Sequence, residues 1–415
     1  MRPLKIWNDI RSKAPFRQVM WLFASYLGLI VLGFALKYEQ THLLDEAMYG
    51  RYALVISVTG ILAIIFRFGY FISLQVLLAK NVNSERERKL LGAGFMAALA
   101  CGLGLSLSTW LMSDAISAFF HEDVGGLLRS LSPLFAVIPM SSLLVAYGSG
   151  TNKVWVNMLV NLIPKSLFLL TLLAWPMYGD TIGVSTLLYM NFFSTIAAFI
   201  ALLIYLRPDF SKLGKSLGLL TKKTRSFGLK YYSGAIVNQT TYRLDEVCIG
   251  YFINAGALGI YSLANMVCSP MLLMSQSLST SLFKRFSGSK RIPAKVFLYN
   301  TIWLLGCVLF FLMSGQLIVQ LLFSSDFSEV AHYLVPISLV LLVHGSAAPF
   351  SFLVAKSMAH IIRNIAWAEA VVNIAGNLLL IPMYGIMGAI IASFLAKSLN
   401  LLMFIYYYRK YLAVG

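Results

Sequence analysis

Residues 295–323 have the sequence KVFLYNTIWLLGCVLFFLMSGQLIVQLLF, in which no Asp, Glu, Lys or Arg follows Lys295. A helix needs about 20 mostly apolar residues to cross the hydrocarbon core of a bilayer. An α-helix also pairs all of its backbone polar groups internally, which a lipid environment demands. The stretch therefore predicts a transmembrane helix.

The rest of the chain has the same character. Of its 415 residues, 59% are hydrophobic and 12% are charged, whereas soluble domains average about 25% charged residues. The mean hydropathy is +0.78. We therefore predict an all-α polytopic membrane protein with about twelve spans, at residues 18–36, 50–78, 89–112, 127–149, 154–175, 183–206, 230–253, 257–283, 295–323, 330–354, 361–382 and 386–407.

The first of these spans follows a basic N-terminus, as a signal peptide would. No small-residue cleavage site comes after it, so we interpret it as a retained span. The four cysteines lie far apart inside apolar stretches, which argues against a disulfide framework. We expect no metal site and no cofactor. The cysteines are Cys101, Cys248, Cys268 and Cys307.

The charged residues are distributed unevenly between the two sides of the predicted bundle. With the N-terminus inside, 26 of the 33 Lys and Arg residues fall on the inner side and only Lys37 and Arg129 on the outer side. Cytoplasmic loops carry such an excess, so both termini are predicted to be cytoplasmic. The net charge of +17 then reflects topology and attraction to anionic lipids, and excludes nucleic acid as a partner. The basic, weakly amphipathic connection at 207–229 is expected to lie on the membrane surface.

The sequence contains an internal repeat. Pro176-Met177-Tyr178-Gly179 recurs as Pro382-Met383-Tyr384-Gly385, 206 residues later, and Gly50-Arg51-Tyr52-Ala53 resembles Gly259-Ile260-Tyr261-Ser262, 209 residues later. A third set of matches, from Phe120 onward, recurs after 203 residues. The three sets of matching residues occur in the same order in both halves of the chain and are separated by nearly the same number of residues, which indicates a duplication.

The duplication predicts two lobes of six spans each, residues 1–210 and 211–415. An even number of spans inserts both lobes in the same orientation. Transporters built from such parallel repeats bind substrate between the lobes and alternate access by rocking them. The repeat therefore favours a carrier over a membrane enzyme.

Ionisable residues lie inside several predicted spans. Such residues are costly in a membrane and usually mark a substrate or ion pathway. We assign substrate translocation to the cations Arg67, Lys165, Arg243 and Lys397, and the coupling ion to the acids Asp245, Glu246 and Glu369. Five cations against three acids within spans suit an anionic substrate such as a pyrophosphate. His344 is interpreted as a packing residue.

Neutral polar residues accompany these charges in the seventh and eleventh spans. Four amides are predicted to contact sugars: Asn238, Gln239, Asn373 and Asn377. A structural alternative remains open, in which Arg243 pairs with Glu246 one turn away and the asparagines bind neighbouring helices.

Four stretches carry a resemblance to a known family. They are YRLDEVCIGYF at 242–252, GALGIYSLA at 256–264, LFSSDF at 322–327 and NIAGNLLLIPMYGIMGA at 373–389. They resemble polysaccharide flippases of the Wzx group, in the multidrug/oligosaccharidyl-lipid/polysaccharide (MOP) superfamily. The first-lobe counterpart of the seventh span, around Ser25-Tyr26, carries no charge, which leaves that lobe's contribution to Arg67 and Lys165.

The resemblance implies a V-shaped pair of six-helix bundles, similar to multidrug and toxic compound extrusion (MATE) transporters, in the bacterial inner membrane. It implies movement of an undecaprenyl-pyrophosphate-linked oligosaccharide, such as an O-antigen unit, from the cytoplasmic to the periplasmic leaflet, coupled to an ion gradient. Its partners would be this substrate, membrane lipids and the glycan polymerase and export machinery. The protein would not be an enzyme.

Two other functions were considered. A MATE-like drug or cation antiporter would favour acids in the first lobe, whose predicted spans contain none. A membrane glycan polymerase or glycosyltransferase would need sizeable external loops, and the predicted outer loops are short. The sequence leaves open which glycan and which coupling ion are used.

Overall fold

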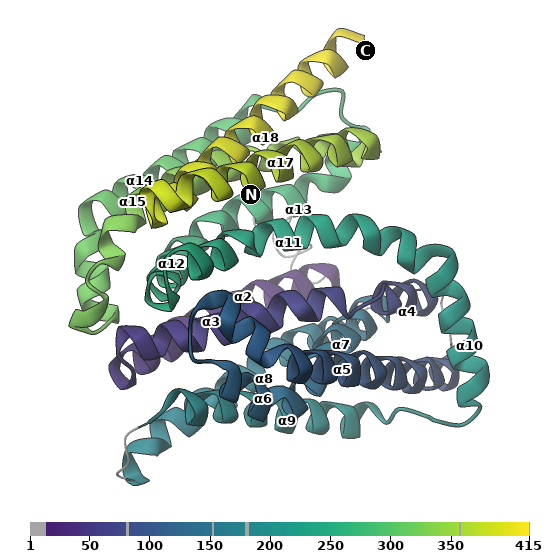
Figure 1. Ribbon diagram of the computed structural model, residues 1–415. Coiled ribbons are helices and arrows are strands. Elements are labelled where there is room, and N and C mark those ends of the chain that lie inside the picture. The colour runs from purple at the N-terminus through teal and green to yellow at the C-terminus, as the bar shows by residue number, and fades with distance from the viewer. Residues whose placement is uncertain (1–13, 80–82, 152, 179–181, 357, 415) are drawn as a thin grey trace, which may run out of the picture. The chain divides into compact units, whose positions relative to one another are not determined.

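The computed structural model describes residues 14–79, 83–151, 153–178, 182–356 and 358–414, which form helices and no strands (Figure 1). Within these ranges, ten helical segments are long and apolar enough to cross a membrane. The two other predicted spans correspond to α2 (Ala14–Leu43) and to α11 (Leu229–Phe252), which is rich in polar residues. The predicted fold class, an all-α polytopic membrane protein, is confirmed.

The first half of the chain is helical. After α2 come α3 (Glu46–Ile65), α4 (Tyr70–Leu78), α5 (Ser84–Phe120), α6 (Gly125–Leu131), η1 (Ser132–Val137), α7 (Ile138–Gly150), α8 (Val154–Ala174), η2 (Trp175–Tyr178), α9 (Val184–Leu206), α10 (Leu213–Lys223) and η3 (Thr224–Gly228).

The second half is also helical. It contains α11, α12 (Ala255–Cys268), η4 (Ser269–Met271), α13 (Leu272–Gly288), α14 (Ala294–Leu322), η5 (Ser325–Phe327), α15 (Val330–Ser346), η6 (Ala348–Phe350), α16 (Ser351–Ala355), α17 (Ala359–Tyr384) and α18 (Ile386–Val414). Prolines lie in η4 and η6, where the predicted spans 257–283 and 330–354 change from one helix to the next. Proline lacks a backbone N–H and interrupts the regular hydrogen bonding of an α-helix.

Residue contacts divide the chain into two compact units. Unit 1 contains residues 1–43, 59–116 and 124–235, and unit 2 contains 44–58, 117–123 and 236–415. In unit 1, α8 packs against α2, α7 and α9, and in unit 2, α18 packs against α15 and α17. The predicted lobes at 1–210 and 211–415 concern the sequence repeat and remain a prediction.

The predicted second span, 50–78, is not one helix. It breaks at residues 66–69 between α3 and α4, where Phe68 and Gly69 have φ angles of 44° and 71°. Gly69 also lies so close to Gly228 that a Cβ there would overlap the Gly228 carbonyl. Glycine adopts positive φ without steric cost, so Gly69 permits both the turn and the close packing, whereas Phe68 takes a backbone conformation that bulky residues rarely adopt.

The basic connection at 207–229 is largely helical. It forms α10 and the π-helix η3, and Leu220 is fully buried in the apolar core of unit 1 with Leu217 packed beside it. Packing on α4, which α10 contacts, removes this apolar surface from water. The expected position of the connection on the membrane surface remains a prediction.

Candidate functional site

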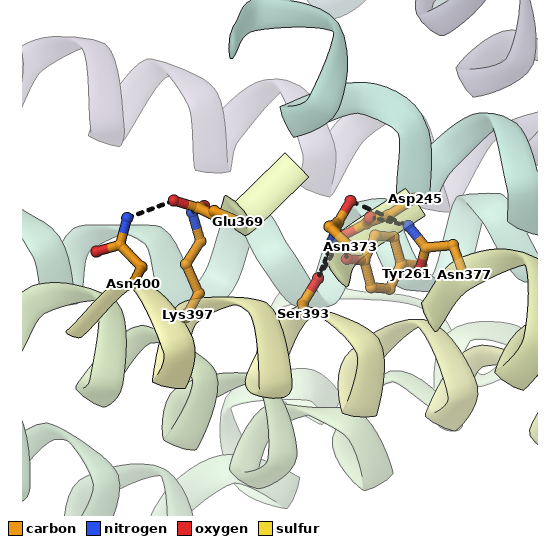
Figure 2. Close-up of polar contacts among 8 residues, drawn as sticks. All are labelled: Asp245, Tyr261, Glu369, Asn373, Asn377, Ser393, Lys397 and Asn400. Carbon is orange, nitrogen blue, oxygen red and sulfur yellow. Dashed lines mark hydrogen bonds and ion pairs between the residues drawn. The ribbon is translucent and has the colours of Figure 1, made fainter. Parts of the chain in front are cut away.

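A buried carboxylate, Asp245, lies at the centre of a polar cluster in unit 2. It is placed by α11 and is only 8% exposed. Its Oδ1 accepts a hydrogen bond from Asn377 Nδ2 at 2.6 Å. Its Oδ2 accepts bonds from Ser393 Oγ at 2.6 Å and from the Tyr261 hydroxyl at 3.0 Å (Figure 2). Four helices, α11, α12, α17 and α18, thus each supply one of these side chains.

Asn373 and Asn377 extend the cluster along α17. Asn377 Nδ2 also donates to Asn373 Oδ1 at 3.2 Å, and Asn373 Nδ2 lies 3.4 Å from Ser393 Oγ. The spacing of four residues places both amides on one face of the helix. Asn377 is fully buried, and its Oδ1 has no hydrogen-bond partner among the described residues. A buried acceptor without a partner costs about 1–3 kcal/mol.

The described residues place no Lys or Arg in an ion pair with Asp245. An ionised group buried without a partner costs several kcal/mol even after relaxation. Three neutral donors reduce this cost without cancelling the charge. The Asp245 carboxylate offers oxygen ligands of the kind that a small hard cation prefers, and it can alternatively hold a proton.

A second polar group lies on α17 and α18, one helical turn from Asn373 and Ser393. Glu369 of α17 forms an ion pair with Lys397 of α18 and accepts a hydrogen bond from Asn400 (Figure 2). The Glu369 and Lys397 side chains are each 12% exposed. The sequence did not reveal this pair, because its members are 28 positions apart.

The third predicted acid, Glu246, has different partners again. Its carboxylate accepts a hydrogen bond from Ser57 Oγ at 2.6 Å. The guanidinium of Arg243 lies 3.9 Å away, which is the one-turn pairing that the sequence left open. The structure therefore separates the three acids: Glu369 and Glu246 face cations, and Asp245 faces neutral groups.

The two predicted cations of the first half lie in unit 1. Arg67 sits in the turn between α3 and α4. This turn is fixed by the Tyr232 hydroxyl, which donates to the Ile64 carbonyl at 2.9 Å. Lys165 is exposed on α8 and lies within electrostatic range of another cation, Lys37 of α2. Unit 1 therefore collects positive charge on two neighbouring helices.

Two predicted sugar contacts fall outside the described residues, since the side chains of Asn238 and Gln239 are not described. His344 is part of α15, and Lys397 acts on it electrostatically. A packing role for this histidine remains a prediction.

Sequence reasoning missed Tyr261, Ser393, Asn400 and Ser57. Tyr261 had been noticed only as part of the repeated Gly-Ile-Tyr-Ser motif. Ser393 and Asn400 lie four residues before and three residues after Lys397, on the same face of α18, so helical spacing from that lysine offered a signal.

A family model described as "Polysaccharide biosynthesis protein" matches residues 16–290. A curated relative, the amylovoran biosynthesis protein AmsL of Erwinia amylovora, is 23% identical over 225 residues, which are 52% of this chain and 55% of the relative. The match thus spans about half the length of that relative.

Two solved structures have similar folds. The lipid II flippase MurJ, in an inward closed conformation, has a TM-score of 0.71 at 15% identity, over 95% of this chain and 89% of the flippase. An inward-facing multidrug resistance MATE family transporter of the MOP superfamily has a TM-score of 0.70 at 13% identity, over 93% of this chain and 95% of the transporter. At these identities the likeness concerns the fold.

Proposed function

This chain belongs to the polysaccharide biosynthesis protein family, and on that premise we propose that it is a flippase for a lipid-linked oligosaccharide. It moves an undecaprenyl-pyrophosphate-linked unit of a surface polysaccharide from the cytoplasmic to the periplasmic leaflet by alternating access. The fold, which it shares with a lipid II flippase, supports a carrier of lipid-linked sugars.

The observation that carries the mechanism is the buried Asp245 carboxylate among neutral donors. A permanent structural charge would be expected to have a cationic partner, as Glu369 has in Lys397. A buried carboxylate without a cationic partner is suited to reversible binding of a proton or a metal cation during transport. We therefore assign the coupling ion, a proton or a sodium ion, to Asp245, with Asn377, Ser393 and Tyr261 as the surrounding ligands.

The pyrophosphate needs fixed positive charge in a medium of low dielectric. Of the four cations assigned to it, Arg243 and Lys397 have acidic neighbours. Lys165, with Lys37 nearby on α2, is the stronger candidate, and Arg67 stands at the break of α3 and α4. Two lysines that repel each other are stabilised when a dianion binds between them.

The charge distribution supports one orientation of the chain in the membrane. The excess of Lys and Arg on one set of loops supports cytoplasmic termini in the bacterial inner membrane. The lipid-linked substrate would enter from the cytoplasmic leaflet, and the glycan polymerase would use it on the other side.

The proposal is tested in the natural host with the gene deleted. Expression of the native chain should restore surface polysaccharide, whereas Asp245→Asn should leave the lipid-linked precursor on the cytoplasmic leaflet at normal protein levels. Asp114→Asn is the matched control, because Asp114 is an exposed carboxylate paired with Arg129. It should support normal export.

Three results would contradict the proposal. Normal surface polysaccharide in the deletion strain would contradict the flippase function. Normal export by Asp245→Asn would contradict the assignment of the coupling site to Asp245 but not the flippase function. Glycan chains that fail to polymerise, while the precursor is found on the periplasmic leaflet, would indicate a polymerase instead.

A further inference from the structure

The segment that follows the sixth predicted span presents a basic groove whose ligand has not been assigned. Figure 1 shows α10 continuing through η3 into α11. Residues 210–244 contain seven Lys or Arg residues and no Asp or Glu. The segment differs in this respect from the start of α5, where Lys89 pairs with Glu85.

Packing fixes which face of this segment points outward. Leu220 is fully buried, and Thr224, whose hydroxyl donates to the Leu220 carbonyl at 2.9 Å, is 3% exposed. Gly228 lies against Gly69 and Ser73 with no room for a side chain. Residues at this spacing form one face of the helix. The opposite face is therefore held in place, and cannot turn into the core.

That outward face forms a shallow groove of about 510 Å³, lined by Gly218, Thr221, Lys222, Arg225 and Ser226. It combines one ammonium, one guanidinium and two hydroxyl groups, while a glycine keeps one end open. Neither Lys222 nor Arg225 has an ion-pair partner among the described residues. Arginine and lysine together with hydroxyl donors are typical of phosphate recognition.

We propose that this groove binds the phosphate of an anionic phospholipid in the cytoplasmic leaflet. The groove begins at Gly218, about three helical turns of chain after α9 ends at Leu206, on the side where Lys and Arg accumulate. Phospholipid phosphates lie at that level of the membrane, and anionic lipids attract basic segments there. A bound lipid would anchor the α10–η3 segment, and the inference does not depend on which substrate the protein transports.

The test measures lipid binding to the full-length protein without any glycan substrate. Native mass spectrometry in detergent, with added phosphatidylglycerol or phosphatidylcholine, gives the dissociation constant of each lipid. The double variant Lys222→Gln/Arg225→Gln should bind phosphatidylglycerol about 30-fold more weakly, since each cation near the membrane surface is worth about 1 kcal/mol. Thr221→Val, which keeps the shape and loses the hydroxyl, should weaken binding about 5-fold.

The matched control is Lys212→Gln/Lys215→Gln. These two lysines are exposed on the same segment but do not line the groove, so their loss should change the dissociation constant less than threefold. If both double variants bind phosphatidylglycerol equally weakly, the lipid is attracted by the overall positive charge of the segment and the proposed groove is wrong. Equal affinity of the native protein for the two lipids would also overturn it.

Two competitors distinguish the sources of phosphate. Inorganic phosphate at millimolar concentration should not displace phosphatidylglycerol, and displacement would assign the groove to a free anion. Undecaprenyl pyrophosphate should compete no better than phosphatidylglycerol. If it binds more than tenfold tighter and loses this advantage in the Lys222→Gln/Arg225→Gln variant, the groove belongs to the substrate route and the phospholipid assignment is wrong.

Discussion

Replacing Lys397 by Gln should destabilise the protein strongly, and replacing Glu369 at the same time should restore it. Each side chain of this pair is only 12% exposed. Removing one partner of a buried ion pair typically costs about 3–5 kcal/mol, because the remaining charge is left uncompensated. At roughly 2–4 °C per kcal/mol for a domain of this size, Lys397→Gln should lower the melting temperature by roughly 6–20 °C.

The double variant Glu369→Gln/Lys397→Gln leaves two neutral amides that can bond to each other and to Asn400. Its melting temperature should fall within a few degrees of the native value, since a neutral replacement of a buried pair is often tolerated. The assay is thermal unfolding of purified protein in detergent, followed by fluorescence, with membrane levels measured alongside.

Transport by the double variant then separates two roles for Lys397. A purely structural lysine predicts that the stable double variant exports glycan. A lysine that binds pyrophosphate predicts that export is lost even though stability has returned. The reasoning about the pair is refuted if Lys397→Gln melts at the native temperature, or if the double variant is no more stable than either single variant.

Three further predictions concern topology, packing and the substrate. A cysteine at Asp326 should be labelled by an impermeant reagent from outside intact cells and one at Gly218 should not, so labelling of both from one side would contradict the twelve-span topology. Gly102→Ala would place a Cβ on the Ala136 carbonyl, which should cost about 1–3 kcal/mol of stability and lower the melting temperature. In the control variant Gly306→Ala the new Cβ meets no atom within 4 Å, so the melting temperature should not fall. Equal melting temperatures of the two variants would refute the packing argument. Lys165→Ala should slow export roughly 10- to 150-fold, the value of a charge-assisted hydrogen bond of about 1.5–3 kcal/mol, while Lys165→Arg should retain most of it, and unchanged export of the alanine variant would exclude a role in binding.

The positions of the helices could be predicted well from the sequence. The predicted spans 154–175, 183–206 and 295–323 agree within a residue or two with α8, α9 and α14. The break at Phe68-Gly69 was missed, because apolar residues continue through it. Gly228, which packs against this turn, lies more than 150 residues away in the sequence, so the packing leaves no local signal.

The candidate site was only partly predictable. Asp245 and Asn377 were selected because polar residues within a span need a reason, and this argument requires only hydropathy. Their contact was not predictable, since 132 residues separate them. For the same reason the sequence could not tell Asp245 from its neighbour Glu246, although one faces three neutral donors and the other faces Ser57 and Arg243.

The sequence by itself determined that this chain crosses the membrane many times as helices, because the hydrocarbon core admits only long apolar segments whose backbone groups are paired internally. It also determined which residues are costly at that depth. The tertiary structure alone decided how each cost is met: Lys397 by Glu369, and Asp245 by neutral groups on three other helices. Hydropathy acts on each segment separately, whereas charge compensation depends on distances of a few ångströms between segments that only packing brings together.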